Sequence, residues 1–433
     1  MNRSPRDPRP AAGSPRESRS PRSSMLAGAP LAVLVSVVGL VVVALGTFAL
    51  GSGDLPFSIG GGNNNPGASG QTGNNPGPAK TATPSNVVVV PSDVPQGVKV
   101  PGTLVYAKDG NIWLQSNGVA SQLTTGGNDA MPSFTADGAN VLFVRTRYVK
   151  GLWNNGVGGM SYYAMNVPSV MQIPTAGGTP KRLLDGSYNP PGRGQWMAWI
   201  REPVLSPNGR TLAIVTDLPN PAAQGSDVVL KLYDLNSGHL TDPNVDEVSP
   251  LGHQDPAWRS DGKVLAYVYN NRDGANGVPQ IYGYTTATGR ARAISGPGYL
   301  HPSWSPDGKY LAVTKTSAYG TDIAIINATT GAEINLLTSD GASWAPTWSP
   351  AGDQIAFLHS SGQVVDLRLV ALTGPYGDWT AGDSIDLTQD AGLDSISRPD
   401  WFVPADQIPA ATPVGGGSST APSDSSPAAP SPS

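Results

Sequence analysis

The sequence predicts an all-β fold, a six-bladed β-propeller, from three observations. A proline-led phrase recurs six times, the copies are spaced at about the length of a propeller blade, and the repeat begins and ends in the middle of a unit. The chain has 433 residues with 53 Gly and 42 Pro, a composition typical of turns and loops. Between the turns, short runs rich in β-branched residues are bounded by Gly, Asn or Asp, which indicates strands.

The repeated phrase has a proline, a large apolar residue shortly after it, a turn and a second apolar run. Its copies are PSFTADGANVLFV from Pro132, PVLSPNGRTLAIV from Pro203, PAWRSDGKVLAYV from Pro256, PSWSPDGKYLAVT from Pro302, PTWSPAGDQIAFL from Pro346 and the shortened PDWFVP from Pro399. The intervals between them are 71, 53, 46, 44 and 53 residues. A blade of four strands needs roughly 40–50 residues.

Each part of the phrase has a physical role. Proline starts a strand, where its missing N–H costs least. Residues 305–308, SPDG, suit a type I turn, since Pro presets φ at the second position and Gly tolerates a positive φ at the fourth. We expect the repeat aromatics to fill the wedge between neighbouring blades: Phe134, Trp258, Trp304, Trp348 and Trp401.

The two ends of the repeat region predict how the ring closes. Residues 103–106, 111–115 and 121–124 are typical of the second, third and fourth strands of a blade whose first strand is missing. Residues 398–403 are a first strand without the other three. Pairing them in one shared blade hides both sheet edges, which would otherwise promote aggregation. This gives six blades, or seven if the long second blade contains another.

These phrases resemble the repeats of TolB-like β-propellers, also called WD-like or PD40 repeats. The resemblance covers about residues 100–405. It implies a rigid, disc-shaped binding platform outside the cytoplasm, although such repeats occur in periplasmic scaffolds, peptidase propeller domains and cell-wall-associated membrane proteins alike. TolB itself has an additional N-terminal α/β domain with no counterpart here, so the resemblance does not extend to a Tol–Pal role. Nor is there room for the hydrolase domain of prolyl oligopeptidase-like relatives.

Residues 31–50 form an uncharged apolar stretch long enough to cross a bilayer as a helix. Six Arg precede it, and no Lys or Arg lies in residues 51–65, so the positive-inside rule places the N-terminus in the cytoplasm. We therefore expect a single-pass plasma-membrane protein with an extracytoplasmic propeller; a cleaved signal peptide is the alternative. The predicted organisation is a disordered basic segment (1–24), a signal-anchor helix (25–50), a Gly/Asn/Pro tether (51–100) reaching about 35–40 Å, the propeller (101–405) and a disordered Pro/Ser/Ala tail (406–433).

Composition and motifs exclude several functions. The chain has a net charge of -5 and concentrates six of its Arg in residues 1–24, so the remainder is acidic and nucleic-acid binding is not expected. It contains no Cys, which removes disulfides, thiolate catalysis and Cys-based metal sites. No G-x-S-x-G, H-E-x-x-H, phosphate-loop or EF-hand pattern occurs in the propeller region.

One group of candidate site residues remains. The residue before each repeat Pro should lie on the innermost strand beside the central channel: Met131, Glu202, Asp255, His301, Ala345 and Arg398. Two carboxylates and an imidazole on neighbouring blades suit a divalent cation or a ligand. Alternatively, Glu202, Asp255 and His301 pair with Arg398 or Arg201 and simply line a channel. We expect no cofactor, and the alternative is a divalent cation bound in the channel.

The enlarged second blade supplies the other candidate surface. Residues 147–170 and 187–201 are expected to form long loops that carry aromatic side chains, as partner-binding loops do. The candidates are Trp153, Tyr162, Tyr163, Arg193, Trp196 and Trp199. The alternative is that these rings fold onto their own blade.

Three functions follow from these observations. The first is a non-catalytic platform for a protein or an envelope glycan, with its binding site at the channel mouth or on the second-blade loops. The second is a metal-assisted hydrolase or lyase using Glu202, Asp255 and His301, an analogy at the level of fold only. The third is a sensor or assembly subunit of an envelope complex. The sequence does not indicate an oligomeric state.

Overall fold

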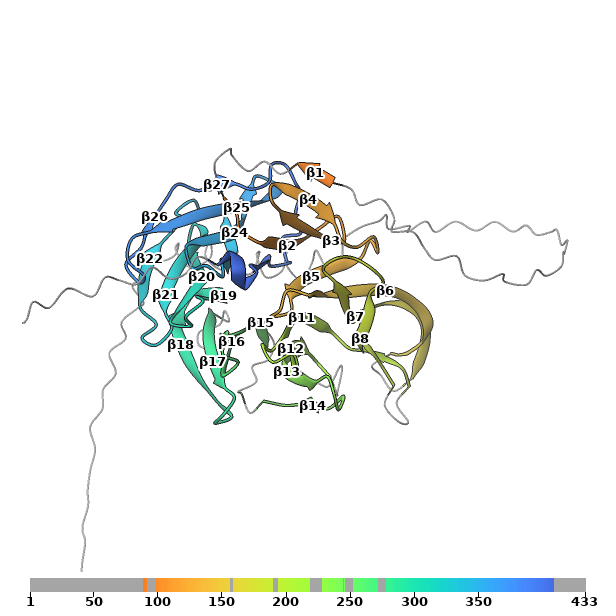
Figure 1. The fold of residues 1–433 in the computed structure, drawn as a ribbon. Helices are drawn as coiled ribbons and strands as arrows, with labels where there is room; N and C mark the ends of the chain where they lie inside the picture. Colours follow the sequence, from red (N-terminus) through yellow and green to blue (C-terminus); the bar gives the residue numbers. More distant parts are fainter. Residues whose placement is uncertain are drawn as a thin grey trace, which may run out of the picture.

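The computed structural model describes residues 89–91, 99–155, 159–189, 194–218, 228–243, 245, 252–271 and 278–408. In this part of the chain, six sheets of four or five strands surround a central axis, and β9 and β10 form a separate two-stranded sheet (Figure 1). The predicted six-bladed propeller is confirmed. The predicted anchor, residues 31–50, lies outside the described residues, among which no helix could span a membrane.

Blade 1 closes the ring as predicted. Its innermost strand is the last one of the chain, and its register joins Thr103 to Phe402 and Val105 to Asp400. The strands, from the channel outward, are β28 (Asp400–Phe402), β2 (Thr103–Lys108), β3 (Asn111–Ser116), β4 (Val119–Gln122) and β1 (Val89–Pro91). β1 lies within the segment predicted to be a tether, so part of that segment joins the propeller edge.

Blades 2 and 3 follow, each running outward from the channel. Blade 2 contains β5 (Asp129–Phe134), β6 (Asn140–Asn154), β7 (Met160–Pro174) and β8 (Lys181–Asp185). The separate β9 (Ser187–Tyr188) and β10 (Trp196–Met197) connect it to blade 3, which contains β11 (Ile200–Leu205), β12 (Thr211–Thr216), β13 (Val229–Asp234) and β14 (Leu240–Thr241).

Blades 4 to 6 repeat the pattern. Blade 4 contains β15 (His253–Trp258), β16 (Val264–Asn271), β17 (Val278–Thr285) and β18 (Arg290–Pro297). Blade 5 contains β19 (Tyr299–Trp304), β20 (Tyr310–Ser317), β21 (Gly320–Asn327) and β22 (Glu333–Leu336). Blade 6 contains β23 (Ser343–Trp348), β24 (Gln354–Ser361), β25 (Val364–Thr373), β26 (Thr380–Ala381) and β27 (Ile385–Asp386), and the chain ends its described part with the 3₁₀ helix η1 (Ala405–Gln407).

The predicted turns form between the first and second strands of the blades. In blade 5 the Gly308 N–H donates to the Ser305 carbonyl over 2.9 Å, and Gly308 has a φ of 68°. The Ser305 hydroxyl also donates to Asp307 over 2.8 Å. This is the type I turn that the SPDG phrase predicts, with Gly where a side chain would be strained.

The core consists of layers between neighbouring blades. Phe134, Trp348 and Trp401 are buried in these layers, as predicted. Trp258 and Trp304 are only half-buried, and the indole of Trp304 donates to the Ala257 carbonyl of blade 4 over 3.0 Å. These two rings therefore also reach the surface of the channel.

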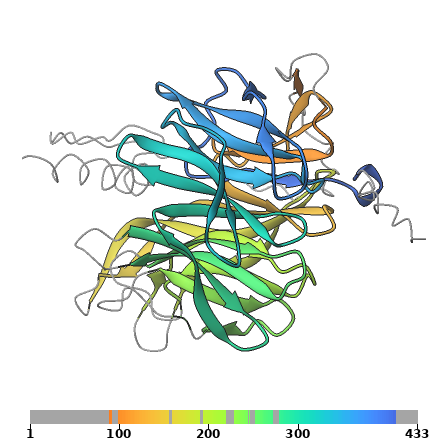
Figure 2. The same ribbon diagram turned by 90° about the vertical axis from the view of Figure 1, so that its left-hand side faces the viewer.

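The long second blade contains no hidden seventh blade. β6 and β7 pair without interruption from Asn140 opposite Pro174 to Asn154 opposite Met160. The expectation of a long loop over residues 147–170 is therefore wrong: these residues continue the blade as an extended hairpin. Figure 2 shows this hairpin on one face of the disc and η1 on the opposite face. We call these the hairpin face and the η1 face.

Candidate functional site in the central channel

The residues before the repeat prolines lie beside the channel, as predicted, and all of them except Arg398 share an unusual backbone conformation. Met131, Glu202, Asp255, His301 and Ala345 have φ values between 49° and 55°. At each of them the pairing with the next strand shifts register, which marks a β-bulge. Non-glycine residues adopt this left-handed conformation at a cost of about 1–2 kcal/mol, so the surrounding contacts must hold it in place.

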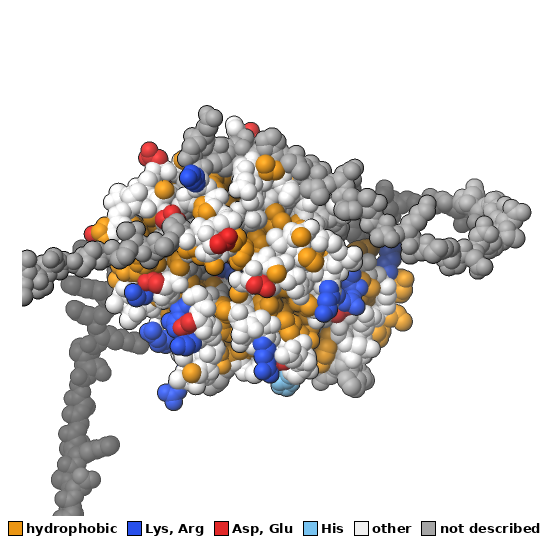
Figure 3. Space-filling model, viewed as in Figure 1, with side chains coloured by type: hydrophobic (Ala, Val, Ile, Leu, Met, Phe, Trp, Pro, Cys, Tyr) orange, Lys and Arg blue, Asp and Glu red, His pale blue; other side chains and the backbone are white. Residues whose placement is uncertain are grey.

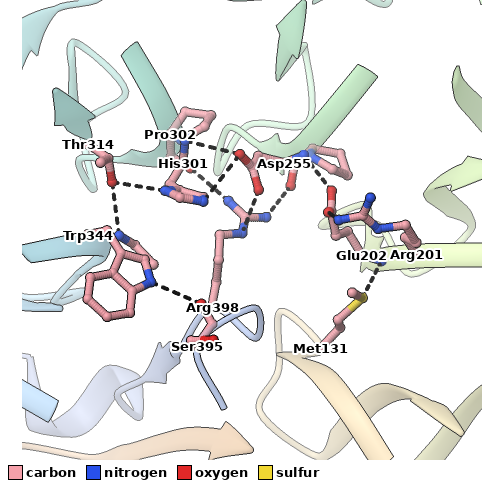
Figure 4. A network of polar contacts seen from close by, with 12 residues as sticks. Met131, Arg201, Glu202, Asp255, His301, Pro302, Thr314, Trp344, Ser395 and Arg398 are labelled. Atoms are coloured by element: carbon pink, nitrogen blue, oxygen red, sulfur yellow. Dashed lines mark hydrogen bonds and ion pairs between the residues drawn. The ribbon is translucent and has the colours of Figure 1, made fainter. Parts of the chain in front are cut away.

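Those contacts run from blade to blade around the channel. The N–H of each bulge residue donates to a side chain of the preceding blade. Glu202 N–H donates to Met131 Sδ over 3.4 Å, Asp255 N–H to Glu202 Oε2 over 2.5 Å, and His301 N–H to Asp255 Oδ2 over 3.2 Å. Met131, Glu202 and Asp255 thus serve as acceptors that join blades 2 to 5 (Figure 4).

The remaining two blades use other acceptors. The Ala345 N–H donates to Thr314 Oγ1 over 2.9 Å, and the Met131 N–H donates to Ser397 Oγ over 2.8 Å. Ala345 has no acceptor for blade 1. The Trp344 indole, which donates to the Ser395 carbonyl over 3.0 Å, links blades 6 and 1 instead.

Arg398 crosses the channel from blade 1 to the opposite side of the ring (Figure 4). Its Nη2 donates to the Pro256 carbonyl over 3.0 Å and its Nη1 to the Pro302 carbonyl over 3.4 Å. Its Nε lies 3.5 Å from Asp255 Oδ1. One guanidinium thereby joins the closing strand to blades 4 and 5 and occupies the middle of the channel.

Glu202, Asp255 and His301 do not come together as metal ligands. Within the described residues, no group of three or more His, Asp or Glu side chains is arranged to hold a metal ion. Glu202 instead accepts from Arg201 over 3.1 Å, and Asp255 faces Arg398. Glu202 and Asp255 thus pair with Arg201 and Arg398, as in the alternative in which these residues simply line the channel.

Burial changes the ionisation of two ring residues. It raises the pKa of Glu202 because the charged form loses solvation, an effect that Arg201 partly offsets. Burial also lowers the pKa of His301, despite the opposing effect of Asp255. Thr314 Oγ1 accepts from Ala345, so its own proton is free to be donated to His301 Nδ1, 2.9 Å away. A neutral imidazole with its proton on Nε2 accepts this hydrogen bond at Nδ1, so Thr314 can accept from Ala345 and donate to His301 at the same time.

The lowered pKa of His301 predicts a pH dependence of stability. The unfolded chain binds this proton more readily than the folded chain, so protonation of His301 favours unfolding. Its contribution to the free energy of unfolding is therefore complete above about pH 6.5 and is lost as the pH falls below that value. Urea unfolding should therefore show that His301→Gln loses less stability than the wild type between about pH 7.5 and about pH 5. Buried carboxyl groups, whose raised pKa values act in the opposite direction, remain in both proteins. Equal losses would show that His301 does not titrate in this way.

Asp400 is a site residue that the sequence analysis missed. Its carboxylate accepts from the Phe134 N–H of blade 2 over 2.8 Å and from the Trp401 N–H over 2.8 Å, and burial raises its pKa. Ser303 occupies the same place in blade 5 and accepts from the Trp348 N–H over 3.0 Å. The available signal was the polar residue that follows the proline in several copies of the phrase.

A cavity of about 720 Å³ opens on the η1 face. Met131, Glu202 and Arg398 contribute to its lining, as do repeat prolines and aromatics and the turns between the first and second strands. Ala405 and Ile408, in and after η1, also line it. Figure 3 shows this face, with apolar side chains around the centre, acidic side chains also near the middle, and most Lys and Arg side chains nearer the edge.

The charged groups in the cavity wall are engaged with the protein. Glu202 faces Arg201, Arg398 faces Asp255, and Asp400 accepts two backbone N–H groups. Asp137, which is exposed at the rim, accepts from the Thr135 hydroxyl and from the Ala139 N–H. The half-buried rings of Trp258 and Trp304 supply flat apolar surface instead. The cavity therefore suits an uncharged or weakly charged ligand that stacks on aromatic rings.

The second-blade candidates divide into three groups. Tyr162 is 72% exposed and Trp199 is 43% exposed, whereas Trp196 is half-buried. Trp153, proposed as a contact residue, is only 1% exposed, and its strand bridges to Gln195, so it supports the hairpin from within. Tyr163 is 37% exposed and donates to the Asn154 carbonyl. Arg193 lies outside the described residues.

The fold and the channel define a β-propeller of the binding-platform type. Residues 194–378, which span most of blades 3 to 6, match the family model of the TolB beta propeller domain, PD40. That part of the propeller is therefore similar to the TolB β-propeller domain. A comparison with curated proteins found no match.

One solved structure supports the fold. TolB from Acinetobacter baumannii superposes with a TM-score of 0.50 at 17% identity, covering 69% of this chain and 66% of that one. This chain thus spans about two-thirds of that protein's length. A TolB-type protein from Agrobacterium tumefaciens gives 0.46 at 15% identity, covering 72% of this chain and 96% of that one. At these identities the likeness concerns the fold alone.

Proposed function

We propose that this protein is a non-catalytic binding platform, held outside the cytoplasm by residues 31–50, that receives a protein segment or an envelope glycan in the cavity on its η1 face. The apolar stretch and its flanking arginines support the anchoring and the orientation. The TolB-like propeller supports the role of a platform.

The cavity carries this proposal. Its volume of about 720 Å³ lies within the range of about 300–1,000 Å³ that is usual for ligand pockets. Half-buried tryptophans with polar groups at the rim are typical of sites that bind peptides or sugars by stacking. Blades on opposite sides of the ring line the cavity, so its shape depends on the closure of the ring by β28.

The ring residues support binding rather than chemistry. An acid, base or metal ligand needs a free oxygen or nitrogen facing the substrate. Here Glu202 and Asp255 accept N–H groups from the neighbouring blades and face Arg201 and Arg398. His301 Nδ1 contacts Thr314.

The test is to fill the cavity without disturbing its walls. Ala136 is exposed and lines the cavity rim, so Ala136→Trp should block access. Thr329→Trp is the matched control, because Thr329 is exposed on a turn of the same face and does not line the cavity. Tagged full-length chains are crosslinked in membranes, and partners are quantified; envelope glycan fractions are tested in parallel by tryptophan emission.

We expect Ala136→Trp to lower partner recovery or glycan affinity at least about tenfold, as loss of one central contact does. Thr329→Trp should bind like the wild type. Equal binding by wild type and both variants would contradict the cavity as the receptor site.

A further inference from the structure

The outer side of the β6–β7 hairpin exposes large apolar side chains together. Tyr148 is 68% exposed, Leu152 57% and Tyr162 72%. Leu152 is directly opposite Tyr162 in the ladder, and alternation along β6 places Tyr148 on the same side as Leu152. Met160, opposite Asn154, adds a fourth exposed apolar side chain, 43% exposed.

The inner side of the hairpin is different. Trp153 and Val167 are fully buried there, and Arg147 pairs with Asp185. The hairpin therefore packs against the protein through its inner side, and the apolar side chains of its outer side remain exposed. Isolated exposed apolar residues are ordinary, but four on one side of a projecting hairpin indicate an interaction surface.

The chemistry of this surface fits a bilayer. Tyr rings with aliphatic neighbours are the residues enriched at membrane–water interfaces, where the ring lies among acyl chains and the hydroxyl meets the headgroups. Lys150, the exposed residue between Tyr148 and Leu152 on the same side, suits a lipid phosphate. None of the described residues opposite it across the ladder, Tyr162, Ala164 and Asn166, carries a negative charge.

The direction of β1 agrees with the same orientation. β1 runs antiparallel to β4, and β4 runs antiparallel to β3, so β1 has the direction of β3. Like β3, β1 thus runs away from the side of the turn at Asp109 and Gly110. Lys108, beside this turn, forms a β-bridge to Leu393, which precedes the innermost strand β28. The chain then runs through β28 to η1, so the turn lies on the face opposite η1, which is the hairpin face. β1 therefore runs from the hairpin-face side toward the η1 face, with its first residue, Val89, at the end nearer the hairpin face.

We propose that the outer side of the β6–β7 hairpin rests on the surface of the bilayer in which residues 31–50 are anchored. This inference depends on the proposed anchoring but not on the proposed cavity ligand. With the hairpin face against the lipid, the η1 face and its cavity point away from the membrane toward envelope partners. The predicted tether of about 35–40 Å keeps the propeller close enough to the bilayer for a weak surface contact to persist.

The absence of cysteine allows a direct test. Full-length Leu152→Cys and Thr329→Cys are each labelled with an environment-sensitive fluorophore and reconstituted in nanodiscs that contain anionic phosphatidylglycerol. Leu152 reports the hairpin face and Thr329 the η1 face. Quenching by lipids with a nitroxide near the headgroup then measures how close each label is to the bilayer. Extraction with alkaline carbonate tests the anchor separately.

We expect the label at position 152 to be quenched at least threefold more than the label at position 329. Adding Tyr148→Ser and Tyr162→Ser to the Leu152→Cys chain should remove most of this difference. Equal quenching at the two positions, or none at position 152, would overturn the docking. Release by carbonate would refute the anchoring itself, whereas a failure confined to Ala136→Trp would affect only the cavity ligand.

Discussion

Replacing Arg398 with methionine is expected to lower the free energy of unfolding by about 3 kcal/mol, because it leaves Asp255 buried without its cationic partner. Asp255 is 4% exposed and lies next to a second buried carboxyl, Glu202. The variant also loses the guanidinium bonds to the Pro256 and Pro302 carbonyls. Urea unfolding of the two proteins at neutral pH measures the difference.

The matched control is Arg210→Ala. Arg210 also pairs with an aspartate, Asp234, but its side chain is 62% exposed, so a change within about 1 kcal/mol is expected. Adding Asp255→Asn to Arg398→Met should recover part of the loss, because the amide oxygen still accepts the His301 N–H and no charge remains uncompensated. A double variant no more stable than Arg398→Met would show that the charge pair is not the source of the effect.

Removing residues 398–433 is expected to abolish the folded monomer. β28 covers the edge of β2, and Trp401, 5% exposed, packs in the layer between blades 6 and 1. Without that strand, the β2 edge and the buried Leu104 become accessible, and exposed edges promote association between chains. Size-exclusion chromatography and circular dichroism should therefore show aggregated or partly folded material.

Two controls separate closure from simple shortening. A chain that ends at Ile408 keeps β28 and η1, so it should remain a folded monomer. A synthetic peptide of residues 396–408, added to the shorter chain, should restore folding by adding the missing strand. A monomer with an unchanged melting temperature after removal of residues 398–433 would contradict the role of β28 in ring closure.

Much of the channel could be predicted from spacing alone. The residue before each proline lies on the innermost strand because the repeat has one fixed position for it, and Met131, Glu202, Asp255 and His301 are all found there. Spacing could not show that each bulge turns an N–H toward the neighbouring blade. That contact joins residues about 50 positions apart, such as Glu202 and Asp255, and it makes these acids structural acceptors.

The second blade shows where local sequence preferences gave a wrong prediction. Its residues 147–170 contain Gly, Asn and Pro, which favour a loop by local preference, yet they form two paired strands. The pairing extends from the blade, where Val141 opposite Ile173 is buried, and is continued by the packing of Trp153. Such support comes from outside the segment, so the exposed and buried rings could not be separated from the sequence.

The repeated phrase was sufficient to predict the propeller, its turns and the shared closing blade, because these follow from local signals whose period and truncated ends can be counted, whereas the exclusion of a seventh blade required the pairing of β6 with β7. The structure was needed to show that Arg398 crosses the channel, that the cavity opens on the η1 face, and that Tyr148, Leu152 and Tyr162 share one exposed side. These features depend on which side chains meet across the ring, and no spacing along the chain encodes a contact between opposite blades.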